Sequence, residues 1–304
     1  DFTKNNEFKV LNSNIIANII QKYKFNKTIK KVRKNVNLIC SYRYSAKNPS
    51  IIHDKEKDTI AIKQLNNMVF KWKCPVEYEK ICTAEINTKY LYITVQVKKE
   101  NALNYKKNVG VDLNLKGNLA TVANPINFDY KFLGENAINE RRKYLEMRSR
   151  WQKQLKLLKV KRMGNKENRV MTDVNHKISR DIVNYALENK SNIKMEDLTG
   201  IRNTAKSSRS FKKFLHSWGF YQLRTFVEYK ASMVGLETNF VCPRYTSQMC
   251  FNCKRKMKVI GKEYVCPDVD CGWIEHRDVN AAFNIAVKSI SPSYGGVGAH
   301  TTSS

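Results

Sequence analysis

Four cysteines near the C-terminal end constrain the fold of this chain more than any other feature. They form two close pairs, Cys250-Phe-Asn-Cys253 and Cys266-Pro-Asp-Val-Asp-Cys271. Pairs at this spacing are typical of structural zinc sites, in which two tight turns present thiolates to one ion, and a redox-active pair is the weaker alternative. Because all four ligands are thiolates, the predicted zinc has no open coordination position. We therefore expect it to stabilise the fold and not to catalyse a reaction.

The other four cysteines are scattered and do not suggest a disulfide framework. They are Cys40, Cys74, Cys82 and Cys242. Cysteines paired at metal spacing, beside isolated ones, favour a reducing compartment. No apolar run approaches the roughly 18 residues that a membrane-spanning helix needs, and no signal peptide is visible.

The charge of the chain points to a polyanionic partner. Lys and Arg number 55 against 27 Asp and Glu, which gives a net charge of +28 spread along the sequence. A nucleic-acid backbone is the usual partner of such an excess, although an AT-rich genome also inflates Lys content. The region 141–162 has apolar residues at helical spacing and basic residues on its other faces. We expect it to be one helix whose exposed cations bind nucleic acid.

The order of predicted elements divides the chain into a β-rich part and an α/β part. Residues 1–105 alternate short strands with basic connections, after a possible helix in 14–34. From residue 107 the order is strand, strand, helix, helix, strand, helix, strand, helix, with the first two strands joined by a tight turn at 116–118. This order fits an RNase H-like sheet. The basic segment 202–216 is expected to be a loop near the site, and 291–304 a disordered tail.

Three carboxylates lie in three different predicted elements. Asp112 lies in an apolar strand, where an unpaired carboxylate would be costly to bury, Glu196 ends a second strand, and Asp278 opens the last helix. Each alone is better explained structurally, since Asp278 could cap its helix and Glu196 could be an ordinary strand-end charge. Together, three carboxylates suit a pair of magnesium ions, which prefer oxygen ligands.

Several segments resemble one family when taken together. They are Gly110-Val-Asp112-Leu-Asn-Leu-Lys, His176-Lys-Ile-Ser-Arg, Ile193-Lys-Met-Glu196-Asp197-Leu198, Trp218-Gly-Phe-Tyr-Gln-Leu223, and the stretch from Pro243 through the cysteine pairs to Ile285. Over residues 105–290 the chain resembles TnpB, the transposon-encoded RNA-guided nuclease from which type V CRISPR effectors descend. Residues 30–105 fit only loosely, as the end of the family's wedge-like β-barrel.

The resemblance implies a fold and a domain order. The fold class is α/β, with an RNase H-like (RuvC) mixed sheet interrupted by a zinc ribbon and preceded by a β-rich wedge-like module. The implied domains are a partial wedge-like module (1–105), a RuvC-like domain in two pieces (106–241 and 276–290), and a zinc ribbon that binds target nucleic acid (242–275).

The resemblance also implies an activity and its residues. The chain would be a metal-dependent endodeoxyribonuclease that cuts DNA at a site chosen by a guide RNA, with Asp112, Glu196 and Asp278 as the catalytic acids holding two magnesium ions. The alternative is a nuclease-inactive or truncated RNA-guided DNA-binding protein, acting as a transposase accessory or repressor. Guide RNA and target DNA are the expected partners, and a prokaryotic cytoplasm, in association with the nucleoid, is the expected location. The residues expected to contact nucleic acid are Arg142, Arg148, Lys156, Lys230 and Arg277.

Two features depart from the family pattern. Family members usually carry a longer N-terminal region, so the resemblance implies a chain that is short at this end. The second cysteine pair usually encloses two residues, and here it encloses four, 267–270. Zinc should tolerate this insertion, with a changed loop shape.

Overall fold

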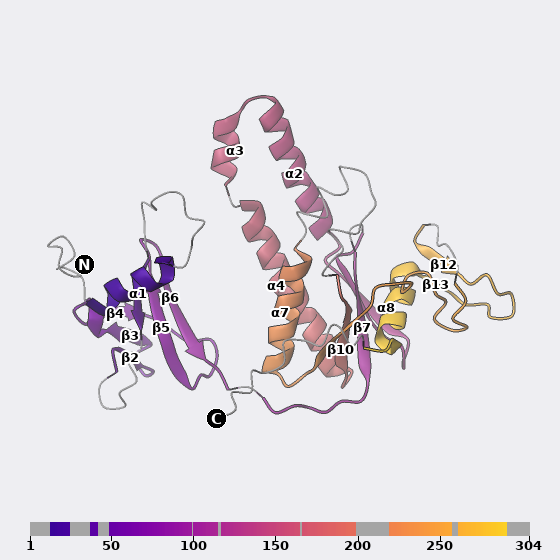
Figure 1. The fold of residues 1–304 in the computed structure, drawn as a ribbon, viewed down its shortest axis with the longest axis horizontal. Coiled ribbons are helices and arrows are strands. Elements are labelled where there is room, and N and C mark those ends of the chain that lie inside the picture. Colours follow the sequence, from indigo (N-terminus) through magenta and orange to yellow (C-terminus); the bar gives the residue numbers. More distant parts are fainter. Residues whose placement is uncertain are drawn as a thin grey trace. The chain divides into compact units, whose positions relative to one another are not determined.

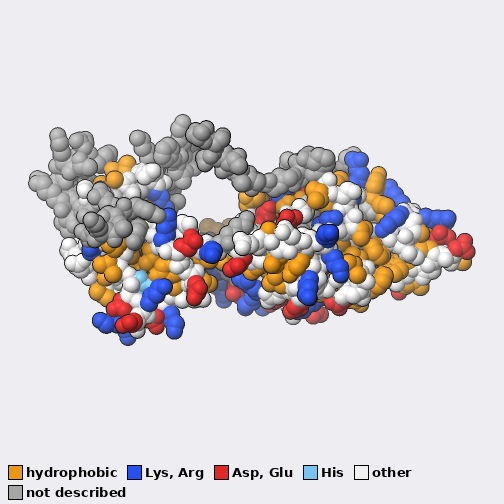
Figure 2. Space-filling model, turned by 90° about the horizontal axis from the view of Figure 1, so that it is seen from below, with side chains coloured by type: hydrophobic (Ala, Val, Ile, Leu, Met, Phe, Trp, Pro, Cys, Tyr) orange, Lys and Arg blue, Asp and Glu red, His pale blue; other side chains and the backbone are white. Residues whose placement is uncertain are grey.

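The structure, a computed structural model, divides the chain into two compact units, residues 1–98 and 99–304 (Figure 1). It describes residues 13–24, 37–41, 49–98, 100–114, 117–164, 166–198, 219–256 and 261–290. The predicted loop at 202–216 and the predicted tail at 291–304 lie outside these residues. Figure 2 shows Lys and Arg side chains spread among hydrophobic ones over the face in view.

The described part of the first unit holds two small antiparallel sheets and one α-helix. The sheets have the strand orders β1-β5-β6 and β2-β3-β4. The elements are α1 (Ser13–Lys24), β1 (Leu38–Ser41), β2 (Ile51–Asp54), β3 (Thr59–Ile62), the 3₁₀ turn Lys63–Leu65, β4 (Met68–Lys71), β5 (Lys80–Ile86) and β6 (Leu91–Gln96). Ile15 from the helix packs in one core with Ile51 and Ile60 from the strands. The prediction of a β-rich region is confirmed for the described residues. Of the possible helix over 14–34, the part up to Lys24 belongs to α1, and residues 25–34 lie outside the described ones.

The second unit is built on a mixed sheet of five strands with the order β11-β10-β7-β8-β9. These are β7 (Asn108–Leu113), β8 (Ala120–Asn124), β9 (Asp129–Leu133), β10 (Asn192–Glu196) and β11 (Thr238–Val241). The neighbours β7, β10 and β11 run parallel, while β7, β8 and β9 form an antiparallel meander. The predicted α/β class is therefore confirmed, and the four predicted strands are present as β7, β8, β10 and β11, but β9 was not predicted from the sequence.

A group of helices in this unit lies on the other side of the sheet from α8 (Figure 1). They are α2 (Ala137–Lys153), α3 (Leu157–Met163), α4 (Lys166–Glu188) and α7 (Phe220–Met233). Alternate strand residues such as Val109, Val111 and Val122 bury against apolar residues of α4 and α7, including Ile182 and Val227. This is the larger core of the molecule.

The helix predicted over 141–162 is broken in the structure. Helix α2 ends at Lys153, and Leu155 then adopts a left-handed conformation with φ of 52° before α3 begins. Leu155 and Leu158 are 81% and 71% exposed, so they do not continue the apolar stripe that the spacing suggested. Because the described residues offer no surface that buries these leucines, the basic run lacks the buried face that would stabilise a single long helix.

Helix α8 (Arg277–Val287) packs on the opposite face of the sheet, over β7 and β8. Gly110 permits this contact, because a Cβ at that position would lie 1.9 Å from the Ala282 carbonyl oxygen. The preceding segment forms the cysteine region and the short strands β12 (Glu263–Val265) and β13 (Ile274–His276), which pair antiparallel. Helix α8 thus joins the cysteine region directly to the sheet.

Candidate active site and metal centre

The three predicted acids come together in one pocket. Asp112 lies in β7, Glu196 is the last residue of β10, and Asp278 is in the first turn of α8. Since β7 and β10 are parallel neighbours, their carboxyl ends meet at the same edge of the sheet, and α8 begins over that edge. All three side chains line a pocket of about 400 Å³.

The pocket places carboxylates where their charges are costly. Asp112 and Asp278 are only 8% and 4% exposed. Burial raises the pKa of Asp112 well above its usual range, and the neighbouring Glu196 and Asp278 carboxylates raise it further. Burial also raises the pKa of Glu196, although hydrogen bonding to Thr246 and the charge of Lys288 oppose the rise. A divalent cation would relieve this repulsion, and carboxylate oxygens are the donors that magnesium prefers. Among the described residues, however, only the four cysteines described below form a group whose ligand atoms all lie within 4.8 Å of one another.

Neighbouring side chains fix two of the acids in place. The Thr246 hydroxyl hydrogen-bonds the Glu196 carboxyl group and lies 3.0 Å from the Pro243 carbonyl oxygen. The Arg277 guanidinium donates to Asp278 Oδ1 through Nε at 3.0 Å and Nη2 at 2.9 Å, and to the Gly261 carbonyl oxygen at 3.1 Å. Sequence reasoning assigned no role to Thr246, because a lone threonine in a loop carries no spacing signal.

Asp197 follows Glu196 directly but takes part in a different contact. Its buried carboxylate accepts a hydrogen bond from Arg224 Nη1 at 3.2 Å. The Arg224 guanidinium lies 3.6 Å from the centroid of the Phe240 ring, which holds it over β11. Successive residues of a strand point to opposite faces, so only one of two adjacent acids can face the pocket.

The four cysteines of the two predicted pairs also converge. Their sulfur atoms all lie within 4.8 Å of one another. Around a tetrahedral zinc ion with bonds of about 2.3 Å, sulfurs are roughly 3.8 Å apart. The Sγ atoms of Cys250 and Cys271 are 3.8 Å apart, and those of Cys253 and Cys266 are 3.4 Å apart. The cluster therefore fits a zinc ion held by four thiolates.

Two asparagines of α8 connect this cluster to the acid pocket. Asn280 donates to the Met249 carbonyl at 2.8 Å and accepts from the Phe251 amide at 3.0 Å and the Trp273 indole at 3.1 Å. One turn later, Asn284 donates to the carbonyls of Thr246 and Met249. Both asparagines were missed from sequence. Their spacing of four on a helix that follows a cysteine pair is the signal that could have found them.

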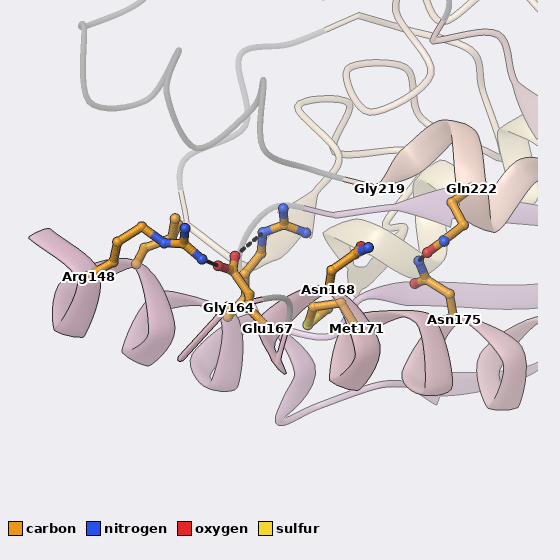
Figure 3. Close-up of a pocket in the computed structure, with 10 residues that line it drawn as sticks. Arg148, Gly164, Glu167, Asn168, Met171, Asn175, Gly219 and Gln222 are labelled. Carbon is orange, nitrogen blue, oxygen red and sulfur yellow. Dashed lines mark hydrogen bonds and ion pairs between the residues drawn. The ribbon is translucent and has the colours of Figure 1, made fainter. Parts of the chain in front are cut away.

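The five residues predicted to contact nucleic acid have different environments. Arg142 and Lys156 are exposed. Arg148 donates from Nη2 to Glu167 at 3.1 Å, in a pocket of about 440 Å³ between α2, α4 and the start of α7 (Figure 3). Arg277 is held by Asp278, as described above. Lys230 is 4% exposed and donates to the His176 carbonyl at 2.5 Å and to Ser179 Oγ at 2.7 Å. The structure therefore does not present Lys230 to a nucleic acid.

Known proteins share this architecture. Residues 220–285 match the family model "Cas12f1-like, TNB domain". A TnpB-like protein of Methanocaldococcus jannaschii is 32% identical over 216 residues, which cover 71% of this chain and 71% of that protein. The CRISPR-associated endodeoxyribonuclease Cas12f1 of Sulfoacidibacillus thermotolerans is 38% identical over 120 residues, covering 38% of this chain and 26% of that enzyme.

A solved structure supports the fold itself. The cryo-EM structure of a Cas12f1–sgRNA–target DNA complex superimposes with a TM-score of 0.60 at 16% identity, over 92% of this chain and 70% of that chain. Within the described residues, no helix is both long and apolar enough to cross a membrane.

The fold and the two clusters define a mixed α/β protein in which a four-cysteine metal motif adjoins a pocket of acids. The similarity to the relative from Methanocaldococcus jannaschii identifies the family of this protein. The chain belongs to the TnpB family. The Cas12f relatives are named as endodeoxyribonucleases, and a relative from Streptomyces pristinaespiralis, 33% identical over 131 residues, is named a putative RNA-guided DNA endonuclease.

Proposed function

We propose that this chain is a transposon-associated, RNA-guided DNA endonuclease with an RNase H-like (RuvC) catalytic domain. The observation that carries the proposal is the convergence of Asp112, Glu196 and Asp278, from three separate elements, on one pocket. The relatives named as RNA-guided or CRISPR-associated DNA nucleases support the substrate class. The match covers only a quarter of the length of Cas12f1, so the activity of the whole enzyme is inferred from the site.

The domain assignment follows from the same reasoning. We assign 106–241 and 276–290 to the RuvC-like domain, 242–275 to a zinc ribbon, and 1–105 to a partial wedge-like module. The strand order β11-β10-β7-β8-β9, with an antiparallel meander beside two parallel strands, supports the RNase H-like assignment.

The proposed mechanism gives a task to the three acids of the pocket and to Thr246 and Arg277. Two magnesium ions held by the three acids would supply Lewis-acid stabilisation and an activated water for phosphodiester hydrolysis. Glu196, held by Thr246, would orient the attacking water. Asp112 and Asp278 would complete the cation site, with Arg277 keeping the Asp278 carboxylate in position. Repulsion among the three acid charges makes cation binding favourable.

Nucleic-acid binding outside the pocket is assigned to exposed cations. Arg142 and Lys156 remain candidates for phosphate contacts, since both are exposed beside other basic residues of 141–162. Arg148 and Arg277 would have to share their guanidinium groups between a carboxylate and a phosphate. Lys230 is not part of the proposal.

A cleavage assay tests the function. The chain, loaded with its co-purifying RNA, is given a duplex matched to that RNA and magnesium. Asp112→Ala should abolish cutting and leave duplex binding largely unchanged, while the control Asp173→Ala, at an exposed carboxylate of α4, should cut normally. Magnesium-dependent cutting by Asp112→Ala would overturn the proposed site. Guide-dependent binding without cutting by the unaltered chain would instead favour the binding-only alternative.

A further inference from the structure

Strand β9 carries two half-exposed aromatic rings next to the acid pocket. Tyr130 and Phe132 are 41% and 37% exposed. Their ring centroids are 5.4 Å apart, and Phe132 meets the His276 ring edge-on at 4.9 Å. These three residues are called the aromatic stripe below. His276 immediately precedes Arg277 and Asp278, so the stripe leads directly to the pocket.

The strand register explains why the stripe faces the acids. Asp112 pairs with Thr121, and Thr121 pairs with Phe132. Directly paired residues of antiparallel strands point to the same face of a sheet, so Phe132 and Asp112 share a face. Two inter-strand spacings put their backbones about 10 Å apart.

Helix α8 covers β7 and β8 on this face and leaves the aromatic stripe accessible. Ala123, the register partner of Tyr130, is fully buried against Val279 and Ala282 of the helix. Beyond it β9 is the last strand of the sheet, and its rings extend past the helix. Edge strands usually expose charged residues, so a pair of half-exposed aromatics here needs an explanation.

The orientation of the His276 ring is set by the helix. Its Nδ1 accepts a hydrogen bond from the Asp278 amide at 3.2 Å, which caps α8. The imidazole is thereby held between Phe132 and the acid pocket. A ring fixed in this way loses little conformational freedom when a flat ligand stacks on it.

Positive charge lies on the same side of the pocket. The Lys262 ammonium is 3.6 Å from the position that a Cβ at Gly117 would occupy, at the turn between β7 and β8. The Arg277 amide donates to the Lys262 carbonyl at 2.7 Å, so the two basic residues are neighbours. Flat apolar rings flanked by cations are the combination that binds single-stranded nucleic acid, through base stacking and phosphate contacts.

We infer that the aromatic stripe is a stacking platform for unpaired bases of the DNA strand being cut, with Lys262 and Arg277 at its phosphates. The inference rests on the proposed function and adds to it the side chains on which the bases of the bound strand would stack. Bases seated on Tyr130 and Phe132 would bring a phosphodiester bond of the same strand to the acids.

The test measures binding and does not depend on cutting. RNA-free protein in the Asp112→Ala background is titrated with a fluorescent single-stranded oligonucleotide, without magnesium and at several salt concentrations. Phe132→Ala should weaken binding about 5- to 150-fold, the range for loss of one stacked base. The salt dependence should not change, because no phosphate contact is lost. Lys262→Ala should instead reduce the slope of log affinity against log salt by about one.

Four comparisons separate stacking from a folding defect. Phe132→Leu keeps an apolar side chain and should bind as weakly as Phe132→Ala, whereas Phe132→Trp should restore binding. Tyr221→Ala, at a 73% exposed ring on α7, is the matched control and should bind normally. An oligonucleotide with abasic sites should show no difference between Phe132 and Phe132→Ala.

The opposite results would overturn the inference. They are unchanged binding by Phe132→Ala, full binding by Phe132→Leu, or an equal loss on the abasic oligonucleotide. Loss of duplex binding equal to that of single-strand binding would also exclude a platform for unpaired bases. A chain that never cuts DNA but shows the predicted stacking would refute the proposed nuclease and leave the stripe in place.

Discussion

Asn280→Ala should destabilise the folded protein by weakening the attachment of the cysteine region to α8, while the four-cysteine cluster itself stays intact. Asn280 is fully buried on α8 and makes three hydrogen bonds to the cysteine region, with the Met249 carbonyl, the Phe251 amide and the Trp273 indole. Its replacement leaves the Phe251 amide and the Trp273 indole without this partner, while the Met249 carbonyl keeps its hydrogen bond from Asn284. Each such group costs about 1–3 kcal/mol. Because part of this cost is recovered as the two groups relax towards water, we expect a loss of about 2–4 kcal/mol, a large part of the roughly 5–15 kcal/mol typical of a folded domain.

The four cysteines that would hold zinc are untouched by this change. All four thiolates belong to 250–271, so the variant should still bind one zinc ion per chain. The measurements are urea unfolding of the zinc-loaded protein, followed by far-ultraviolet circular dichroism, and zinc content by atomic absorption. Asn136→Ala is the control: Asn136 is exposed, and its side chain makes no capping hydrogen bond to α2. Its effect should stay within about 0.5 kcal/mol.

Two results would refute this reasoning. A loss below about 1 kcal/mol, comparable with that of the control, would mean that the three hydrogen bonds do not hold the cysteine region on α8. Loss of zinc from the folded variant would mean that Asn280 supports the metal site itself and not only its docking.

Two further predictions concern the sheet and the pocket. Gly110→Ala places a Cβ 1.9 Å from the Ala282 carbonyl oxygen and 2.7 Å from the Ala286 nitrogen. Since the backbone must move, the free energy of unfolding should fall by at least about 3 kcal/mol, the upper end for overpacking. An unchanged melting temperature would contradict the close contact of β7 and α8. Asp112→Asn should stabilise the magnesium-free protein near pH 8. Burial and two nearby carboxylates raise the pKa of Asp112, so the folded state binds its proton more tightly than the unfolded state does. Stability therefore falls as pH rises above about 4, by about 1.4 kcal/mol for each pH unit until the folded carboxyl group also ionises. The advantage of the variant should shrink towards pH 4 in thermal melts, and a variant less stable than the original chain at pH 8 would oppose the raised pKa of Asp112.

The alternation and order of apolar residues were enough to predict most elements and their class. The acids at 112, 196 and 278 could be proposed together because each stands at the end of a strand or the start of a helix. The cysteine pairs predicted their own cluster, since short loops between paired ligands leave few geometries. These predictions hold in the folded protein because they depend only on residues that are close together in the sequence.

Local sequence patterns could not predict the contacts between segments that are distant in the sequence. The break after Lys153 depends on the absence of a surface for Leu155 and Leu158, and the burial of Lys230 depends on how α4 meets α7. The position of Phe132 on the same face of the sheet as Asp112 depends on the register of β7, β8 and β9.

The sequence by itself therefore determined which four cysteines cluster, most of the α/β order and which three acids are candidates for one site. Only the tertiary structure decided that those acids share one pocket, that Thr246 holds Glu196, and that Asn280 and Asn284 attach the cysteine region to α8. The physical reason is that side-chain patterns within an element follow from its own periodicity, whereas the partners of each side chain are chosen when elements pack.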